Sequence, residues 1–259
     1  MTVWAVGVVR DEADIIEATV TRMLRQVDHV LVADNRSVDG TGEILRSLDR
    51  VTVLTDPDPA FADQQAQRTT ALAALAAQRG AQWVIPFDAD EVWVPENGRI
   101  GDLLDDLPED IRLARAVMRN HVSTDRDPPG PDPPSRMVYR LPRFPRMPKV
   151  ACRTAPDLAI LKGNHHAAYG PEWNARHVDG LLSVHHFPVR SPEQFVLKAR
   201  QRADELSNAT IPKEYMESEK RDSARILEDE GEAAIVAKFY DEHWFADPDE
   251  AGLVLDPCP

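Results

Sequence analysis

The sequence predicts an α/β protein whose mostly parallel sheet is covered by helices on both faces. Within residues 1–98, apolar segments of strand length alternate with helical segments four times, as in proteins built from strand–helix units. The strand segments are continuously apolar, which is typical of strands buried on both faces. Polar, mostly acidic residues follow three of these strands, at the edge of an open parallel sheet where ligands bind.

The first elements can be placed in order. A β-branched apolar strand is expected at residues 3–9, followed by a helix over 11–27 with apolar residues at helical spacing. The second strand is expected at 28–34. It leads into the turn-rich segment DNRSVDGTGE, and the segment GEILRSL predicts the next helix at 42–48.

The same alternation continues to residue 90. The segment VTVLTD predicts the third strand at 51–56. A helix is expected over 61–80, ending at a glycine that can adopt the left-handed conformation of a helix C-terminus. The fourth strand is expected at 83–90, WVIPFDAD, so its last residues are already acidic.

The second half is less regular. Strands are expected at 113–122, 135–142, 157–163 and 181–187. Eight of the 21 prolines fall within 128–148, and a segment so rich in proline is expected to form neither a helix nor a central strand. We expect a long irregular loop there, of a kind that is usually functional or disordered. A helix over 191–209 and a long amphipathic helix over 212–243 are expected to follow the last strand.

The composition describes an acidic chain. The 259 residues carry a formal net charge of −14, which repels nucleic acid and anionic membranes. No apolar run approaches the roughly 20 residues of a membrane span, and the N-terminus lacks the features of a signal peptide. We therefore expect a cytoplasmic protein with no nucleic-acid partner and no membrane span. Cys152 and Cys258 are expected to be reduced thiols, because their spacing fits neither a disulfide framework nor a zinc site.

One segment departs from this acidic character. Residues 135–153 carry five arginines and one lysine, Lys149, and no acidic residue. A basic segment in an acidic protein indicates a small anionic partner, and the alternative is a solvated loop balanced by distant acids. Lys149 or one of these arginines could add positive charge beside phosphate groups.

Three carboxylates follow the fourth strand, in VIPFDADEVWVP. They belong to Asp88, Asp90 and Glu91. Side chains at positions i and i+2 of an extended backbone point the same way, so Asp88 and Asp90 are expected to face one pocket. Hard cations such as Mn²⁺ and Mg²⁺ take carboxylate ligands together with substrate phosphates, so the segment predicts a divalent cation site, with an acidic surface turn as the alternative. Glu91 is expected to point away from the other two and to brace the loop through a hydrogen bond or an arginine.

Several segments together resemble glycosyltransferases of the GT-A fold, in the family 2-like group. They are VVRDEADIIEATV after the first strand, VDHVLVADNRSVDGTGEIL around the second, QRTTAL in the third helix, VIPFDADEVW and HHFPVRSPEQFVLK. Together they span roughly residues 3–200. The resemblance implies a GT-A domain over 1–210, with a nucleotide-binding half at 1–98 and an acceptor half at 99–210. Residues 211–259 are expected to form a C-terminal helix and tail packed on the same domain.

The resemblance implies a nucleotide site built from the first three strand–helix units. The backbone near Val9 and Arg10, with Glu12 behind it, would line the nucleobase pocket. Asn35 stands where relatives often carry an aspartate that accepts from a ring N–H of the base. Arg68 matches a basic residue of the third helix that reaches the nucleotide. The alternatives are a plain Asx-type turn after the second strand and an exposed helix arginine.

For Asp88-Ala89-Asp90 the resemblance implies contact with the nucleotide and the cation. Asp88 would touch the ribose or the metal, and Asp90 would bind the metal directly. His186 would be a late metal or phosphate ligand. His185 is its alternative, because adjacent residues of a strand face opposite sides and one of the pair is expected to face the site.

An inverting transferase needs a base near the acceptor hydroxyl. The resemblance places this base in a window that here holds Glu172 and Asp179. Glu172 is slightly favoured because Trp173 beside it could pack on the face of a sugar, and His165 is the competitor. A retaining enzyme would need no such base.

These inferences combine into a metal-dependent glycosyltransferase that moves a sugar from a nucleoside-diphosphate sugar to a polar acceptor, a small molecule or a glycan. Mn²⁺ or Mg²⁺ would neutralise the charge that develops on the departing diphosphate. A non-catalytic sugar-nucleotide-binding module is the alternative. A phosphohydrolase or a nucleotidyltransferase is disfavoured, because the acidic segment follows the fourth strand and no glycine-rich loop, GxGxxG or GxxxxGK(S/T), follows the first.

Overall fold

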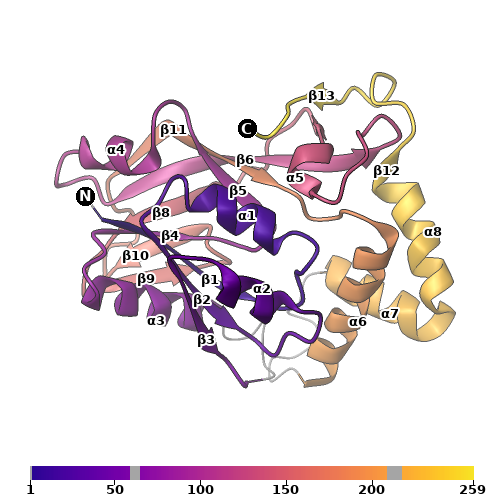
Figure 1. Cartoon of the computed structure of the whole chain (residues 1–259), viewed down its shortest axis with the longest axis horizontal. Helices are drawn as coiled ribbons and strands as arrows, with labels where there is room; N and C mark the ends of the chain where they lie inside the picture. The colour runs from indigo at the N-terminus through magenta and orange to yellow at the C-terminus, as the bar shows by residue number, and fades with distance from the viewer. Residues whose placement is uncertain (1, 59–64, 209–217) are drawn as a thin grey trace.

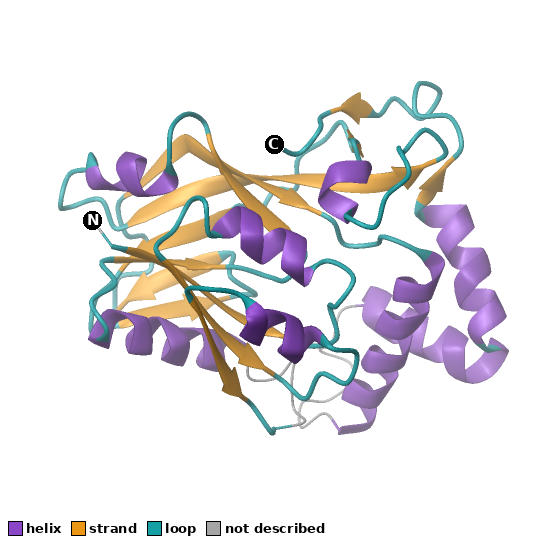
Figure 2. Cartoon of the chain, in the orientation of Figure 1, coloured by secondary structure: helices purple, strands orange, loops and turns teal. Residues whose placement is uncertain are grey.

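The computed structural model of the chain describes residues 2–58, 65–208 and 218–259. The helices expected over 61–80, 191–209 and 212–243 therefore extend partly outside the described residues. The described part forms an 11-stranded sheet with helices on both faces and a separate two-stranded hairpin (Figures 1 and 2). This is the predicted α/β class with a mostly parallel central sheet. Among the described helices, none combines the length and the apolar character that a membrane span requires.

The first half of the sheet is fully parallel. β1 (Val3–Val9) lies between β2 (His29–Asp34) and β4 (Trp83–Pro86), and β3 (Val51–Thr55) extends the sheet beyond β2. The carboxyl ends of these four strands therefore lie at one edge of the sheet. The bounds of the first three strands agree with the prediction to within one residue.

The second half of the sheet mixes strand directions. β8 (Lys149–Arg153) runs antiparallel between β4 and β6 (Leu113–Thr124). β11 (His177–His186) is parallel to β6 and antiparallel to β5 (Glu91–Pro95). In the register of β5 and β11, Glu91 pairs with His186, so the residues after β4 meet the end of β11.

Short strands border β6 near its end. β7 (Tyr139–Arg140) pairs with β6 and with β13 (Val254–Leu255), and β12 (Trp244–Phe245) pairs with the last residues of β6. The C-terminal segment therefore returns to the sheet, and its end lies close to β6 and β11 in Figure 1.

Two apolar cores lie on the two faces of the sheet. One face is covered by α1 (Ile16–Met23), α2 (Thr41–Ser47) and α4 (Ile100–Asp105), and the other by α3 (Gln65–Gln78) and the hairpin of β9 (Leu158–Leu161) and β10 (His166–Tyr169). Alternate residues of β1 supply the cores: Val3 and Ala5 belong to the first, and Trp4 and Val6 to the second. A strand buried on both faces needs an apolar residue at every position, which explains the continuous segment VWAVGVV.

Three helices form a separate layer at one end of the sheet (Figure 1). They are α6 (Pro192–Asn208), α7 (Ser218–Glu230) and α8 (Glu232–Glu242). Phe195 and Phe239 belong to their common core. The single helix expected over 212–243 is wrong in its described part, because Gly231 with a φ of 83° interrupts it between α7 and α8.

The proline-rich segment also departs from expectation. It contains the one-turn helix α5 (Pro133–Arg136), and the strand expected at 135–142 is reduced to β7. Pro133 and Pro134 occupy the first turn of α5, where a missing N–H removes no hydrogen bond. The short strands β5, β8 and β10 were not expected from the sequence.

Candidate active site at the carboxyl ends of the parallel strands

The DADE segment forms a tight turn directly after β4. The backbone N–H of Glu91 donates to the carbonyl of Asp88 at 3.1 Å, and the N–H of Asp88 donates to Oε2 of Glu91, also at 3.1 Å. Because β4 ends at Pro86, the side-chain alternation of an extended strand does not apply here. The expectation that Glu91 points away from Asp88 is therefore wrong, whereas the expected bracing hydrogen bond of Glu91 is confirmed.

Lys149, at the start of β8, holds the turn from the inside. Its Nζ lies 2.6 Å from Oδ2 of Asp88 and 2.8 Å from Oε1 of Glu91. Burial raises the pKa of Glu91 to about 8. Burial also disfavours the charged forms of Lys149 and Asp88. The attraction between these two charges outweighs burial, so the pKa of Lys149 is raised and the pKa of Asp88 is lowered. Asp88 and Lys149 therefore form an ion pair at neutral pH.

His186, at the end of β11, presents a free ring nitrogen to Asp90. Its Nδ1 lies 2.9 Å from Oδ1 of Asn120, which only accepts, so Nδ1 carries the proton. Burial lowers the pKa of the ring, which leaves Nε2 unprotonated at 3.7 Å from Oδ1 of Asp90. The backbone N–H of Phe187 also donates to the carbonyl of Asp90 at 2.9 Å. A neutral imidazole beside a carboxylate is a donor pair that can bind a divalent cation.

His185 faces the opposite side of β11. Its Nδ1 lies 2.8 Å from Nε2 of His121, and Nδ1 of His121 donates to the carbonyl of Met137 at 2.8 Å. Burial lowers the pKa of His121 to about 4 and that of His185 to about 3, so both rings are neutral. One ligand atom from each ring and one from Asp256 lie within 4.8 Å of one another, but two arginines already form ion pairs with this carboxylate.

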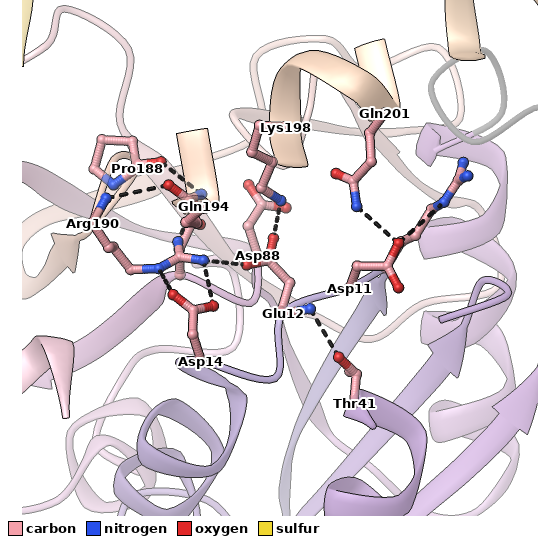
Figure 3. Close-up of polar contacts among 12 residues, drawn as sticks. Asp11, Glu12, Asp14, Thr41, Asp88, Pro188, Arg190, Gln194, Lys198 and Gln201 are labelled. Atoms are coloured by element: carbon pink, nitrogen blue, oxygen red, sulfur yellow. Dashed lines mark hydrogen bonds and ion pairs between the residues drawn. The ribbon is translucent and has the colours of Figure 1, made fainter. Parts of the chain in front are cut away.

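A buried arginine, Arg190, connects the loop after β1 with the end of β11 (Figure 3). Its Nη2 lies 2.7 Å from Oε2 of Glu12, and its Nε lies 2.7 Å from Oδ2 of Asp14. Its Nη1 donates to the carbonyl of Phe187 at 3.0 Å and lies 3.8 Å from Oδ2 of Asp90. The guanidinium thus holds two segments, 178 residues apart in the chain, on either side of the DADE turn.

Glu12 is shared between two cations. Lys198 of α6 binds its Oε1, and Arg190 binds its Oε2. Burial nevertheless raises the pKa of Glu12, against the lowering effect of both cations. No role was assigned to Arg190 or Lys198 from the sequence, although both lie in the matched segment HHFPVRSPEQFVLK. Two basic residues just after the last strand of an acidic chain are the signal that could have found them.

The turn after β2 packs against the loop after β1. Asp39 accepts from the N–H and the hydroxyl of Thr41, at 3.0 and 2.6 Å, and thereby orders the start of α2. The N–H of Glu12 donates to Oγ1 of Thr41 at 2.8 Å. Gly42 allows the first turn of α2 to pack closely on the end of β2, because a Cβ at that position would collide with the carboxylate of Asp34. The turn is of the Asx type, and it also fixes the backbone of Glu12.

Asn35, which follows β2, has an unpaired amide oxygen. Its backbone N–H donates to the carbonyl of Val9 at 2.9 Å. Its Nδ2 donates to Oδ2 of Asp56 at 2.9 Å and to the carbonyl of Asp58 at 2.6 Å. These acceptors determine which way the amide is oriented. Its Oδ1 is buried without a hydrogen-bond partner among the residues that the structure describes, so an acceptor is available beside β1.

Arg68 and Arg10 lie near the same edge of the sheet. Nε of Arg68 lies 3.2 Å from Asp56, and its Nη2 lies 3.1 Å from Asp58. The side chain of Arg68 is only 12% exposed, so the alternative of an exposed helix arginine is wrong. Arg10 turns toward α6, with Nη2 at 3.0 Å from Oδ2 of Asp204. Both arginines are therefore held by carboxylates of this chain.

The two candidate bases lie in different settings. His165 follows Asn164, whose Nδ2 donates to Oδ1 of Asp88 at 3.0 Å. Nδ1 of His165 lies 3.0 Å from the carbonyl of Pro148, and burial lowers the pKa of the ring, so Nε2 carries a free lone pair. Glu172 is exposed in the turn after β10. Among the described residues, its side chain forms no hydrogen bond or ion pair with Asp88, Asp90 or Glu91.

Three solved structures are similar to the chain at low identity. The mannosyltransferase PcManGT from Pyrobaculum calidifontis, in complex with GDP-Man and Mn²⁺, is 15% identical with a TM-score of 0.42, and the match covers 96% of this chain and 77% of that chain. Mannosyl-3-phosphoglycerate synthase from Rubrobacter xylanophilus is 15% identical with a TM-score of 0.39, over 84% and 80% of the two chains.

Glucosyl-3-phosphoglycerate synthase from Mycobacterium tuberculosis was solved with Mn²⁺, uridine diphosphate and phosphoglyceric acid. It is 20% identical with a TM-score of 0.31, over 45% of this chain and 43% of the synthase, so the match spans less than half of the synthase. No curated protein matches the chain.

The model of one protein family matches a continuous part of the sequence. The family is described as glycosyl transferase family 2, and the match covers residues 6–157. This range is more than half of the chain and includes part of β1, all of β2, β3 and β4, the DADE turn and Lys149. The mostly parallel sheet with helices on both faces is the GT-A arrangement that the sequence predicted. The chain therefore belongs to glycosyl transferase family 2.

Proposed function

We propose that the protein transfers a sugar from a nucleoside-diphosphate sugar to a polar acceptor and uses Mn²⁺ or Mg²⁺. The observation that carries this proposal is the meeting of Asp90 with the free Nε2 of His186, beside Asp88, at the edge where the parallel strands end. Open parallel sheets bind ligands at this edge. A carboxylate and an imidazole together form a donor set for a divalent cation.

The charges around the turn favour a cation. Five carboxylates, those of Glu12, Asp14, Asp88, Asp90 and Glu91, share three cationic side chains. Burial and the neighbouring carboxylates keep Glu91 largely protonated at neutral pH, with a pKa of about 8, so a bound cation would favour its ionised form and relieve the repulsion among the others. It would then present positive charge to the phosphates of a nucleotide.

Asp90 and His186 would hold the cation, and Asp88 would stand beside it. Asp88 accepts from Lys149 at 2.6 Å, which fixes its carboxylate in place for contact with the ribose or the cation. When bound, the cation would stabilise the charge that develops on the leaving diphosphate. Asn120 keeps His186 in the tautomer that leaves Nε2 free for a metal.

The nucleoside would lie between the loop after β1 and the end of β2. The unpaired Oδ1 of Asn35 is an acceptor for a ring N–H of the base, and the backbone of Val9 and Arg10 forms the adjacent wall. The side chain of Ala89, between the two aspartates, is buried in the core, so its backbone would be the part that contacts the nucleotide. Arg68 sets the position of the two acids that orient the amide of Asn35.

Arg190 is a positioning residue in this scheme. It touches Glu12 and Asp14 on one side and the backbone of Phe187 on the other. It therefore keeps the nucleobase loop and the end of β11 in a fixed relation to Asp90.

For an inverting reaction, His165 is better placed than Glu172 to act as the base. The free Nε2 of His165 belongs to a ring that lines a pocket next to the DADE turn. Burial and the charge of Lys149 lower the pKa of the ring, and the carboxylate of Asp88 offsets part of this effect, so the ring is neutral and can accept a proton. Glu172 does not line this pocket. Loss of transfer in His165→Ala, with transfer retained in Glu172→Gln, is the expected result.

A thermal-shift screen of nucleoside diphosphates and their sugars, with and without Mn²⁺, tests the donor and the metal together. We expect at least one nucleotide to stabilise the protein only when Mn²⁺ is present. Asp90→Asn should remove this stabilisation, whereas Asp102→Asn, which changes an exposed carboxylate of α4, should retain it.

Two outcomes would contradict the proposal. Stabilisation that needs no metal and survives in Asp90→Asn would show that the DADE turn is not the metal site. Metal-dependent binding of a sugar nucleotide without its hydrolysis, and without transfer to any member of a broad acceptor panel, would favour the non-catalytic binding module instead.

A further inference from the structure

A second pocket lies beside the proposed donor site and has an unusual charge. It has a volume of about 240 Å³ and is lined by residues of β6, β8 and the hairpin of β9 and β10. Its lining includes Arg115, Arg146, Lys162 and three histidines, and no aspartate or glutamate. The whole chain carries 44 acidic residues against 30 lysines and arginines. The charge of this pocket is therefore opposite in sign to the net charge of the protein.

The positive charge of the pocket is only partly balanced. Arg115 is paired with Asp179, whose Oδ1 lies 2.7 Å from Nε. Arg146 and Lys162 form no ion pair within the described parts of the chain. Two unpaired cations at the rim of one concave site attract an anion from solution.

The loop that carries Lys162 is joined directly to the DADE turn. Lys162, Gly163 and Asn164 are three successive residues with left-handed φ values of 53°, 59° and 67°. Two of them are not glycine, so this conformation costs free energy that local contacts must offset. The carbonyl of Gly163 accepts from Nζ of Lys149 at 3.0 Å, and Nδ2 of Asn164 donates to Oδ1 of Asp88 at 3.0 Å. The loop of residues 162–164 therefore connects the pocket to the proposed metal site.

The amide oxygen of Asn164 indicates a missing ligand group. Asn164 is buried, and its Nδ2 must face the carboxylate of Asp88, which fixes the orientation of the amide. Its Oδ1 is buried without a hydrogen-bond partner among the described residues. Buried acceptors without a donor are rare in native proteins. Asn164 is not among the residues that line the pocket, so this oxygen marks the polar region between the pocket and Asp88, where a hydroxyl donor would satisfy it.

An exposed aromatic ring completes the pocket. The side chain of Trp173 is 60% exposed and lies nearly parallel to the ring of His166, with centroids 6.2 Å apart. Exposed indole faces suit the apolar face of a sugar ring. The volume is below the roughly 300–1,000 Å³ of sites for drug-sized ligands, so the occupant has about the size of one sugar.

We propose that this pocket is the acceptor site and that it selects an anionic acceptor, a sugar or polyol that carries a phosphate or a carboxylate. The anion lies between Arg146 and Lys162, and the ring rests against Trp173. The reacting hydroxyl is directed toward His165, which lines the pocket on the side of the DADE turn. The assignment of the pocket as an acceptor site rests on the proposed glycosyltransferase function; the anion binding itself does not.

Calorimetric titration of the full chain with glucose 6-phosphate, glucuronate and glucose, without donor or metal, tests the proposal. We expect the anionic sugars to bind at least about tenfold more tightly than glucose, because hydrogen bonds to charged groups are the stronger ones. Arg146→Ala and Lys162→Ala should each weaken this binding about tenfold. Arg143→Ala, in the same basic segment but outside the pocket lining, is the matched control and should bind as the wild type does.

The comparison between the two anionic sugars identifies the group that the pocket prefers, a phosphate or a carboxylate. Equal binding of glucose, absence of binding by both anionic sugars, or an equal loss in Arg143→Ala would overturn the proposal. Quenching of tryptophan fluorescence by the bound sugar, lost in Trp173→Phe, provides an independent readout of the same site.

Binding of anionic sugars and binding of nucleotides with Mn²⁺ are measured separately, so the two proposals can fail independently. If a nucleotide stabilises the protein with Mn²⁺ but no anionic sugar binds, only the acceptor assignment is wrong. If the anionic sugars bind but no nucleotide stabilises the protein, the anion site stands and the glycosyltransferase function falls.

Discussion

The two sides of β11 carry two histidine–aspartate sets in opposite charge surroundings. On one side, Nε2 of His186 lies 3.7 Å from Asp90, within a cluster where carboxylates outnumber cations. On the other side, His185 and His121 lie near Asp256, whose carboxylate is bound by two arginines at 2.7 and 3.1 Å. Both sets contain neutral rings and a carboxylate.

The comparison teaches that ligand types alone do not make a metal site. The local balance of charge decides whether a divalent cation is attracted, because the field of neighbouring charges is strong in a largely buried region. An excess of acid surrounds Asp90, whereas Arg119 and Arg140 already neutralise Asp256. We therefore expect metal binding on the side of His186 and a purely structural role on the side of His185.

The largest effect is expected for His186→Ala. This change should lower Mn²⁺-dependent sugar transfer by about 100-fold or more, since a direct ligand is worth more than the outer contacts whose loss costs 10–100-fold. The measurement is kcat/KM as a function of Mn²⁺ concentration. His185→Gln is the control and should keep its metal dependence. Equal losses of sugar transfer in His186→Ala and His185→Gln would contradict the assignment of the metal to the His186 side of β11.

The next largest effect is expected for His121→Leu and concerns the free energy of unfolding. His121→Leu leaves the N–H of His185 without its acceptor, so we expect a loss of about 2 kcal/mol at pH 7.5. The pKa of His121 is lowered to about 4 in the folded protein, so the unfolded state binds more protons between pH 6.5 and 4. Wild-type stability therefore falls as the pH falls through this window.

Since Leu does not titrate, the difference between the wild type and His121→Leu should narrow from pH 7.5 to 4.5. Urea unfolding at both pH values measures it. A difference that stays constant or widens would show that His121 is not buried as a neutral ring.

A smaller effect is expected for Asn120→Ala, which removes the acceptor that fixes the tautomer of His186. The apparent affinity for Mn²⁺ should fall about tenfold, and saturating Mn²⁺ should restore most of kcat. A lower kcat at saturating metal with an unchanged affinity would indicate that Asn120 acts on the substrate.

The smallest effect is expected for Asp256→Asn. This change weakens two partly exposed ion pairs, so it should cost about 1 kcal/mol at low salt and less at high salt. Thermal unfolding in buffers of different ionic strength measures the loss. A loss that does not depend on salt would indicate that packing of the C-terminal segment, not charge, matters here.

The fold of the first half could be predicted closely because its strands are buried on both faces. β1 and β2 are mainly continuous apolar segments, and the half-buried β3 at the end of the sheet is still marked by its β-branched residues, so each can be located from local sequence. β5 and β8 escaped prediction because short strands with mixed composition depend on partners far away in the chain. The break at Gly231 and the helix α5 likewise depend on single residues within longer patterns.

Site residues that directly follow predicted strands could be predicted from the sequence. Residues that act through partners far away in the chain could not. Asp88, Asp90 and the histidine pair could be proposed from their positions after strands. The position of Arg190 after a predicted strand could have marked it as a candidate, but its pairing with Glu12, 178 residues away, could not be predicted. Lys149 was one of six basic residues in its segment, and only the β4–β8–β6 pairing places it under the DADE turn.

The most direct test of the central claim is electron paramagnetic resonance of Mn²⁺ titrated into the protein with each of a panel of nucleoside diphosphates. We predict that wild-type protein and His185→Gln bind Mn²⁺ tightly in the presence of one of these nucleotides, and that His186→Ala and Asp90→Asn do not. Tight, nucleotide-dependent Mn²⁺ binding that persists in His186→Ala and Asp90→Asn but is lost in His185→Gln would place the metal on the other side of β11 and contradict the account.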